Sequence, residues 1–102
     1  VVVSDLAPIA GLPPGDYDYF GASVILEPSG RIVLKNGSSL AGSSATMFEC
    51  MNHLSSLSLL SEDDLWRVGR GNPLFLIGET PKEVLSAEST LCYRDGQFEL
   101  VD

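Results

Sequence analysis

The stretch from Ala7 to Gly15 constrains the fold more than any other part of this sequence. It holds three prolines and two glycines within nine residues. Proline lacks a backbone N–H and fixes φ, and both residue types interrupt regular structure, so this stretch is neither helix nor central strand. The short apolar run Val1–Val3 is therefore separated from everything that follows.

Two pairs of apolar, β-branched runs are each joined by a turn signal. Pro28-Ser29-Gly30 joins the first pair, and Asp95-Gly96, the strongest short hairpin signal in the chain, joins the second. Both pairs are predicted to be antiparallel hairpins. The predicted strands are residues 23–27 with 31–35, and residues 90–94 with 97–101.

The period of the apolar residues changes from two to 3.6 between residues 45 and 57, which predicts a helix with Ser43 or Ser44 as its N-cap. A second helix is predicted from Ser61 to about Gly69, with Ser61 as its cap. Asn72-Pro73 then opens a short third helix, which Gly78 ends. The apolar face of the first helix consists of Met47, Cys50, Met51, Leu54 and Leu57, with Phe48 at its edge.

The first three residues, Val1–Val3, have the pattern of a buried parallel strand. No initiator methionine precedes them. We therefore expect the chain to be a segment of a longer protein.

The composition argues against several classes of partner. The formal net charge of the 102 residues is −8, so neither a nucleic acid nor an anionic membrane surface is expected as a partner. No apolar stretch approaches the roughly 20 residues that span a bilayer. Two isolated cysteines, Cys50 and Cys92, predict reduced thiols in a cytoplasmic protein rather than a disulfide framework.

Several short motifs occur in an order that resembles the N-acetylglucosamine-6-phosphate deacetylases of the amidohydrolase superfamily. Each is weak alone, but the ordered set over residues 1–78 is fairly specific. Residues 79–89 depart from the pattern of that family. The motifs are Ser4-Asp5, Ala10-Gly11-Leu12-Pro13, Leu40-Ala41-Gly42-Ser43, Thr46-Met47, Asn72-Pro73 and Gly78.

The resemblance implies an α/β fold, a (β/α)8 amidohydrolase barrel beside a small β-sandwich. Residues 1–78 would be the C-terminal part of the barrel, comprising the last strand, an active-site hairpin and outer helices. Residues 79–102 would supply strands of the sandwich. Asp5, directly after the last strand, would lie at the C-terminal face, where barrel active sites are found.

The implied activity is hydrolytic deacetylation of an N-acetyl amino sugar phosphate by the intact enzyme. Amide hydrolysis needs an activated water and a proton for the departing amine, and a carboxylate performs this transfer. In the resembled family that group matches Asp5. From the residues alone, an Asp that caps a turn after a strand is the competing interpretation.

The second implied site is the loop Leu40, Ala41, Gly42 and Ser43. In similar deacetylases this loop contacts the substrate through main-chain groups, with the residue at the Leu40 position nearest the sugar. Alanine and glycine allow such close approach of a backbone to a ligand. A plain helix-capping loop explains Gly42-Ser43 equally well.

The resemblance also implies a divalent metal, zinc or iron, whose ligands would lie outside this chain. The family uses one Glu and two His from earlier strands, whereas this chain has the single histidine His53, with Cys50 as its nearest co-ligand candidate. No metal-ligating residue is therefore predicted, and the segment alone is expected to be inactive. Its partners would be the remainder of the barrel and, as an open alternative, a second copy in a homo-oligomer.

Two other functions are left open. One is a different amidohydrolase, dihydroorotase-like or aminoacylase-like, which shares the barrel and the Asp after the last strand. The Ala-Gly-Leu-Pro and Leu-Ala-Gly-Ser motifs argue against it. The other is a free-standing, non-catalytic module that binds a partner through its hairpins.

Overall fold

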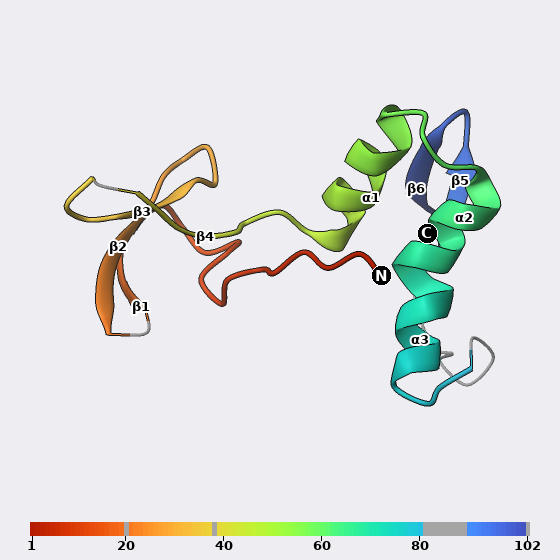
Figure 1. The fold of residues 1–102 in the computed structure, drawn as a ribbon. Coiled ribbons are helices and arrows are strands. Elements are labelled where there is room, and N and C mark those ends of the chain that lie inside the picture. The colour runs from red at the N-terminus through yellow and green to blue at the C-terminus, as the bar shows by residue number, and fades with distance from the viewer. Residues whose placement is uncertain (20, 38, 81–89, 102) are drawn as a thin grey trace. The chain divides into compact units, whose positions relative to one another are not determined.

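The computed structural model describes residues 1–19, 21–37, 39–80 and 90–101. The fold is mixed α/β with two antiparallel sheets. Its contacts group into two compact units: Ser4–Thr46, called the sheet unit, and Val1–Val3 with Met47–Asp102, called the helical unit (Figure 1). Each unit has an apolar core of its own. The domain division after residue 78 concerns a longer protein and stays a prediction.

Four antiparallel strands, neighbours in chain order, form the sheet unit. The middle pair confirms the first predicted hairpin, and the turn between its strands contains Gly30 at a φ of +90°, which glycine adopts without strain. The outer two strands are not among the predicted elements, although Asp16 to Tyr19 alternate acidic and aromatic residues with the period of a strand. The strands are β1 (Gly15–Tyr19), β2 (Ala22–Leu26), β3 (Ile32–Leu34) and β4 (Leu40–Gly42).

One face of this sheet is covered by the Pro/Gly-rich stretch. Val24 and Leu26 alternate with more exposed neighbours along β2, so both side chains reach the core. Ile32 joins them from β3, and Ala7 and Ile9 pack on the same core from the segment before β1. The stretch that cannot form regular structure therefore closes the sheet unit.

The helical unit combines helices with a two-stranded hairpin (Figure 1). Helix α1 (Met47–Ser56) confirms the first predicted helix. The cap of α2 is also as predicted, because the Ser61 hydroxyl accepts a hydrogen bond from the Asp64 N–H. The second and third predicted helices are not separated by a break, since a π-helical turn joins them. These elements are α2 (Glu62–Trp66), η1 (Arg67–Gly71) and α3 (Asn72–Leu76).

The second predicted hairpin is confirmed with both strand ranges, β5 (Thr90–Arg94) and β6 (Gln97–Val101). Asp95 and Gly96 have φ values of +53° and +78°. Positive φ at both central residues is the requirement of a type I′ turn, which Asp-Gly meets at low cost. This hairpin is therefore determined locally.

The core of the helical unit centres on Met51, Leu65 and Phe98. The Phe98 ring meets the ring of Trp66 edge-on at a centroid distance of 5.0 Å, and that of Tyr93 at 4.9 Å. Helix α1, helix α2 and strand β6 thus each contribute one of these three residues to a shared apolar cluster.

Polar side chains on α1 hold the hairpin in place. The Asn52 side chain donates to the Phe98 carbonyl at 3.2 Å and accepts from the Phe98 N–H at 2.7 Å. The Ser55 hydroxyl donates to the Gly96 carbonyl at 2.7 Å and lies 2.9 Å from the Tyr93 hydroxyl. These bonds satisfy backbone groups of the hairpin that no neighbouring strand reaches.

The expected strand at Val1–Val3 is not formed. These residues have no regular structure, Val1 and Val3 are 57% and 74% exposed, and the Val2 N–H donates to the Val68 carbonyl at 2.9 Å instead. A parallel strand needs a strand beside it, and the part of the chain described contains none for this segment. The barrel itself concerns a longer protein and stays a prediction.

Two local predictions are also wrong at the start and end of the first helix. Neither Ser43 nor Ser44 is its N-cap, because α1 begins only at Met47. The Ser43 hydroxyl accepts from the Ala45 N–H, outside the helix. Leu57 lies beyond the end of α1 and is 48% exposed, because the amphipathic pattern extends further than the helix.

Among the described residues, no helix has the length and apolar character needed to cross a bilayer.

Candidate functional site

Asp5 is exposed and has an unusual backbone conformation. Its φ is +52°, in the left-handed region that Asp and Asn enter more readily than other non-glycine residues. Within the described residues its carboxylate makes no hydrogen bond, so the turn-capping interaction is not seen there. Asp5 therefore presents a carboxylate to solvent from a backbone conformation that most residue types avoid.

Residues Leu40 to Ser43 form a strand and its end, neither the substrate-contacting loop that the resemblance implies nor the helix-capping loop of the competing interpretation. Leu40–Gly42 is β4, which pairs with β3 through an irregular register between Ile32 and Val33. Leu40 is 63% exposed, whereas the Ala41 side chain packs against the core of the sheet unit.

The segment after Asp5 pairs with the end of this strand. Leu6 and Ser43 form an isolated parallel bridge, and the Ala7 N–H donates to the Ser43 carbonyl at 2.8 Å. The two segments singled out from the sequence thus lie side by side within the sheet unit, although Asp5 and Ser43 are 38 positions apart in the chain.

Gly42 has a packing role in this arrangement. A Cβ built on it would lie 3.2 Å from the Ala7 Cβ, which is tighter than ordinary contact. The absence of a side chain at Gly42 lets the Leu6-Ala7 segment approach the strand. The resemblance implies a ligand close to this backbone, but here the Leu6-Ala7 segment of the chain itself approaches it closely.

Potential metal ligands are not gathered in the described part of the chain. No group of three His, Cys, Asp or Glu side chains in it could hold a metal ion. His53 is exposed on α1, and Cys50 and Cys92 are both free and half-buried. The described residues therefore form no metal site of their own, and the resemblance places the ligands of the implied divalent metal outside this chain.

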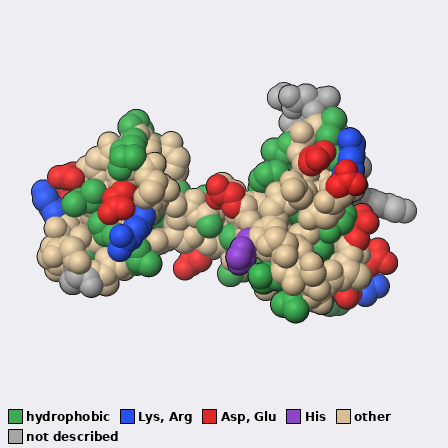
Figure 2. All heavy atoms as spheres, turned by 90° about the horizontal axis from the view of Figure 1, so that it is seen from above, with side chains coloured by type: hydrophobic (Ala, Val, Ile, Leu, Met, Phe, Trp, Pro, Cys, Tyr) green, Lys and Arg blue, Asp and Glu red, His purple; other side chains and the backbone are tan. Residues whose placement is uncertain are grey.

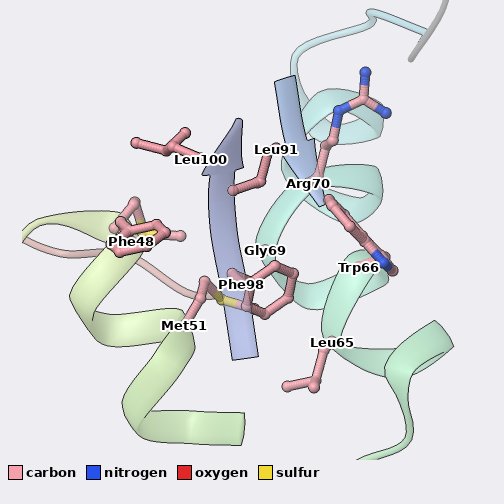
Figure 3. Close-up of a pocket in the computed structure, with 10 residues that line it drawn as sticks. Phe48, Met51, Leu65, Trp66, Gly69, Arg70, Leu91, Phe98 and Leu100 are labelled. Atoms are coloured by element: carbon pink, nitrogen blue, oxygen red, sulfur yellow. The ribbon is translucent and has the colours of Figure 1, made fainter. Parts of the chain in front are cut away.

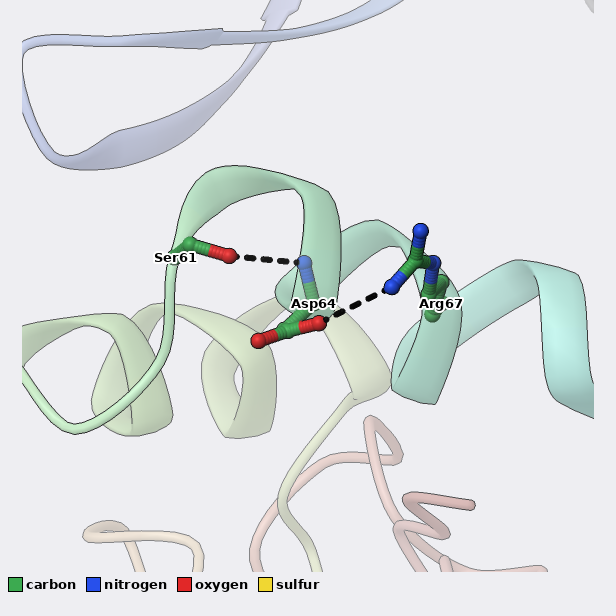
Figure 4. A network of polar contacts seen from close by, with 3 residues as sticks. All are labelled: Ser61, Asp64 and Arg67. Carbon is green, nitrogen blue, oxygen red and sulfur yellow. Dashed lines mark hydrogen bonds and ion pairs between the residues drawn. The ribbon is translucent and has the colours of Figure 1, made fainter.

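The acidic residues 62–64 stabilise the start of a helix. The Asp64 carboxylate accepts from the Arg67 guanidinium at 3.3 Å, while its backbone N–H donates to Ser61 (Figure 4). The Glu62 carboxylate accepts from the Trp66 ring N–H at 3.3 Å. Acidic side chains near the N-terminus of a helix also favour its dipole.

Charged side chains are dispersed rather than concentrated. On the face drawn in Figure 2, Asp and Glu side chains occur over both units, with Lys and Arg among them. The net charge of −8 therefore does not produce one dominant acidic surface on that face.

The helical unit contains an apolar cavity that no pattern in the sequence predicts. It has a volume of about 290 Å³ and lies between α1, the α2–η1 segment and the hairpin (Figure 3). Most of its residues have the apolar pattern of ordinary core positions in the sequence, so only their arrangement reveals the cavity. They are Met47, Phe48, Met51, Leu65, Trp66, Gly69, Arg70, Leu91, Phe98 and Leu100.

Comparison with protein-family models, with curated proteins and with solved structures found no match for this chain.

Proposed function

We propose that this chain is the C-terminal segment of a metal-dependent amidohydrolase that removes the acetyl group from an N-acetyl amino sugar phosphate. The ordered motifs from Ser4-Asp5 to Gly78 support this proposal. The proposed place of action is the cytoplasm, in keeping with the two free thiols.

The observation that carries the proposal is the pairing of Leu6 with Ser43. It brings the chain next to Asp5 against the end of the Leu40–Ser43 segment, which supports the proposal that the two act on one substrate. An active site requires such convergence of residues distant in sequence.

In this proposal Asp5 is the general acid/base. Its carboxylate takes a proton from the attacking water and passes that proton to the nitrogen of the departing amine as the C–N bond breaks. The products are acetate and the free amino sugar phosphate. An exposed carboxylate without a hydrogen-bond partner in the described residues is available for this transfer.

Leu40 to Ser43 bind the substrate in this proposal, chiefly through main-chain groups. Leu40 is the residue nearest the sugar, and its 63% exposed side chain leaves room for that contact. A divalent metal, held by residues outside this chain, would supply Lewis-acid chemistry. The described residues supply only the proton transfer and the substrate contacts.

The test is the substitution Asp5→Asn in the intact protein, with deacetylation of an N-acetylated sugar phosphate as the assay. Asparagine tolerates the left-handed backbone conformation as well as aspartate does, so the fold is preserved. Because the amide cannot shuttle a proton, turnover should fall about 10²–10⁴-fold. Thermal unfolding should stay close to that of the unmodified protein.

Asp16→Asn is the matched control, because Asp16 lies in the same unit and pairs with Lys35 on an exposed surface, 3.2 Å away. It should leave turnover unchanged. An Asp5→Asn protein that retains most of its turnover would remove Asp5 from the catalytic machinery.

A non-catalytic binding module is the second candidate, and the apolar cavity of the helical unit favours it. The two candidates differ in the same assay. A correctly folded intact protein without deacetylase activity on any N-acetylated sugar phosphate would favour the module.

A further inference from the structure

The two outer edges of the C-terminal hairpin differ in how their backbone groups are satisfied. The pair next to the Asp-Gly turn is hydrogen-bonded and such pairs alternate along the strands, so the N–H and C=O groups of Leu91 and Tyr93 point outward from β5. On the opposite edge, those of Phe98 point outward from β6 and are bonded by the Asn52 side chain. Within the described residues, the outward groups of Leu91 and Tyr93 have no hydrogen-bond partner.

Strand β5 also lacks the features that protect an exposed edge. Natural sheets protect such edges with charged side chains, proline or bulges. In the sheet unit, the outward-pointing residues of the edge strand β1 are Asp16 and Asp18, and β4 ends at the bridge between Leu6 and Ser43. Strand β5 has neither proline nor a shift in register, and its one charged residue, Arg94, lies next to the turn. Its edge is therefore a template for another strand.

The spacing of the outward groups makes this edge complementary to itself. When two β5 strands pair antiparallel about a twofold axis at Cys92, Leu91 of each copy lies opposite Tyr93 of the other copy. The outward N–H and C=O groups of these residues then bond one another in both copies, and none is left over. A peptide of arbitrary sequence has no such symmetric match, whereas a second copy always has it.

The side chains are compatible with the same register. Leu91 is 40% exposed in the hairpin and would pack on the Tyr93 ring of the other copy, an aromatic–aliphatic pair across neighbouring strands. Arg94 would face Thr90, so no like charges lie opposite one another. The symmetric pairing therefore covers apolar surface without opposing charges.

We propose that the β5 edge is a self-association surface, at which two copies of this chain pair antiparallel and join their hairpins into one continuous sheet. The proposal uses neither Asp5 nor Leu40–Ser43, so it is independent of the proposed deacetylase function. Because a contact between two strands is small, the association is expected to be weak and to depend on protein concentration.

Cys92 gives the first readout, because the register places the two Cys92 residues opposite each other at the axis. In a non-hydrogen-bonded antiparallel pair the Cα atoms lie about 4.5 Å apart, within the roughly 4.4–6.8 Å that a disulfide spans. Diamide takes up the two protons and two electrons released as an S–S bond forms. It should link two copies of the intact protein, and mass spectrometry of the digested dimer should identify a Cys92–Cys92 bond. Cys50→Ser should leave this link intact.

A matched pair of variants tests the edge itself, with sedimentation equilibrium as the assay. Leu91→Pro should weaken the self-association of the intact protein about tenfold or more, because it removes an interface N–H from each copy. Leu100→Pro is the control, since Leu100 is the cross-strand partner of Leu91 and its N–H points outward from the opposite edge. It should leave the association unchanged. Neither change removes a hydrogen bond between β5 and β6.

A second pair of variants covers the case in which a proline variant does not fold, which thermal unfolding detects. Leu91→Lys keeps the backbone N–H but places a charge on the edge, so it should also weaken the association. Leu100→Lys, on the opposite edge, should not. In the unmodified protein, hydrogen exchange at the Leu91 and Tyr93 amides should slow as the protein concentration rises. The Cys92 amide, already bonded to β6, should be protected throughout.

Three results would overturn the proposal. The first is an intact protein that stays monomeric at every concentration and forms no Cys92–Cys92 link. The second is protection of the Leu91 and Tyr93 amides in the monomer, which would show that another segment of a longer protein pairs with this edge. The third is equal association of the Leu91 and Leu100 variants, which would place the contact between copies elsewhere.

Discussion

Replacing Asn52 by leucine tests how α1 holds the C-terminal hairpin. The strands are joined by two residues, so Arg94 and Gln97 are the pair beside the turn, and the next pair is Tyr93 with Phe98. Antiparallel pairs alternate between hydrogen-bonded and non-hydrogen-bonded, so the N–H and C=O of Phe98 point away from β5. The Asn52 side chain bonds both groups, at 2.7 and 3.2 Å.

The cost of the substitution follows from those two bonds. A hydrogen bond in a folded protein contributes about 0.5–1.5 kcal/mol net, so losing both should destabilise the helical unit by about 1–3 kcal/mol. The upper half of that range is expected, because Phe98 is only 3% exposed and water reaches its backbone poorly. Leucine has the higher helix propensity, by roughly 0.5 kcal/mol, so α1 taken alone would gain stability.

The assay combines urea unfolding with hydrogen exchange at the Phe98 amide. A loss of about 2 kcal/mol corresponds to an exchange protection reduced by up to about 30-fold. His53→Gln, at the next position of the same helix and on its exposed face, is the control and should change neither quantity. An Asn52→Leu protein with unchanged stability and unchanged exchange at Phe98 would show that the hairpin is held by apolar packing alone.

Two further predictions concern glycine-dependent positions. Leu40→Ala in the intact protein should change deacetylation little, whereas Gly42→Val should raise the apparent KM. Because a Cβ on Gly42 would press on Ala7, thermal unfolding of both variants must be measured as well. Equal, negligible kinetic effects of the two changes would leave Gly42 only its packing role. Gly96→Ala should destabilise the hairpin by about 1–2 kcal/mol, because alanine is strained at a φ of +78°. Urea unfolding measures this loss, and an unchanged midpoint of the unfolding transition would contradict the turn geometry.

Resemblance and geometry contribute differently to the candidate site. The motifs in the sequence single out Asp5 and Leu40 to Ser43, but they do not place one segment beside the other. That arrangement depends on the Leu6–Ser43 bridge, a contact between residues far apart in the chain. The cavity beside Phe98 has no signal in the sequence, because a residue that lines an opening and one that fills a core have the same apolar pattern.

The sequence by itself determined the features that depend on neighbouring residues. Asp95-Gly96 meets the dihedral requirements of its own turn, and Ser61 caps α2 through a residue three positions away. Their energetics are local, so no distant contact is needed to form them.

Only the tertiary structure decided the features that require a distant partner. Val1–Val3 has the composition of a buried strand, yet in the described residues no strand lies beside it, and its Val2 N–H bonds Val68 instead. Leu40–Gly42 has weak strand character, yet it becomes β4 because β3 offers its edge. A strand satisfies its backbone groups only through another segment, so its formation depends on which segments the fold brings together.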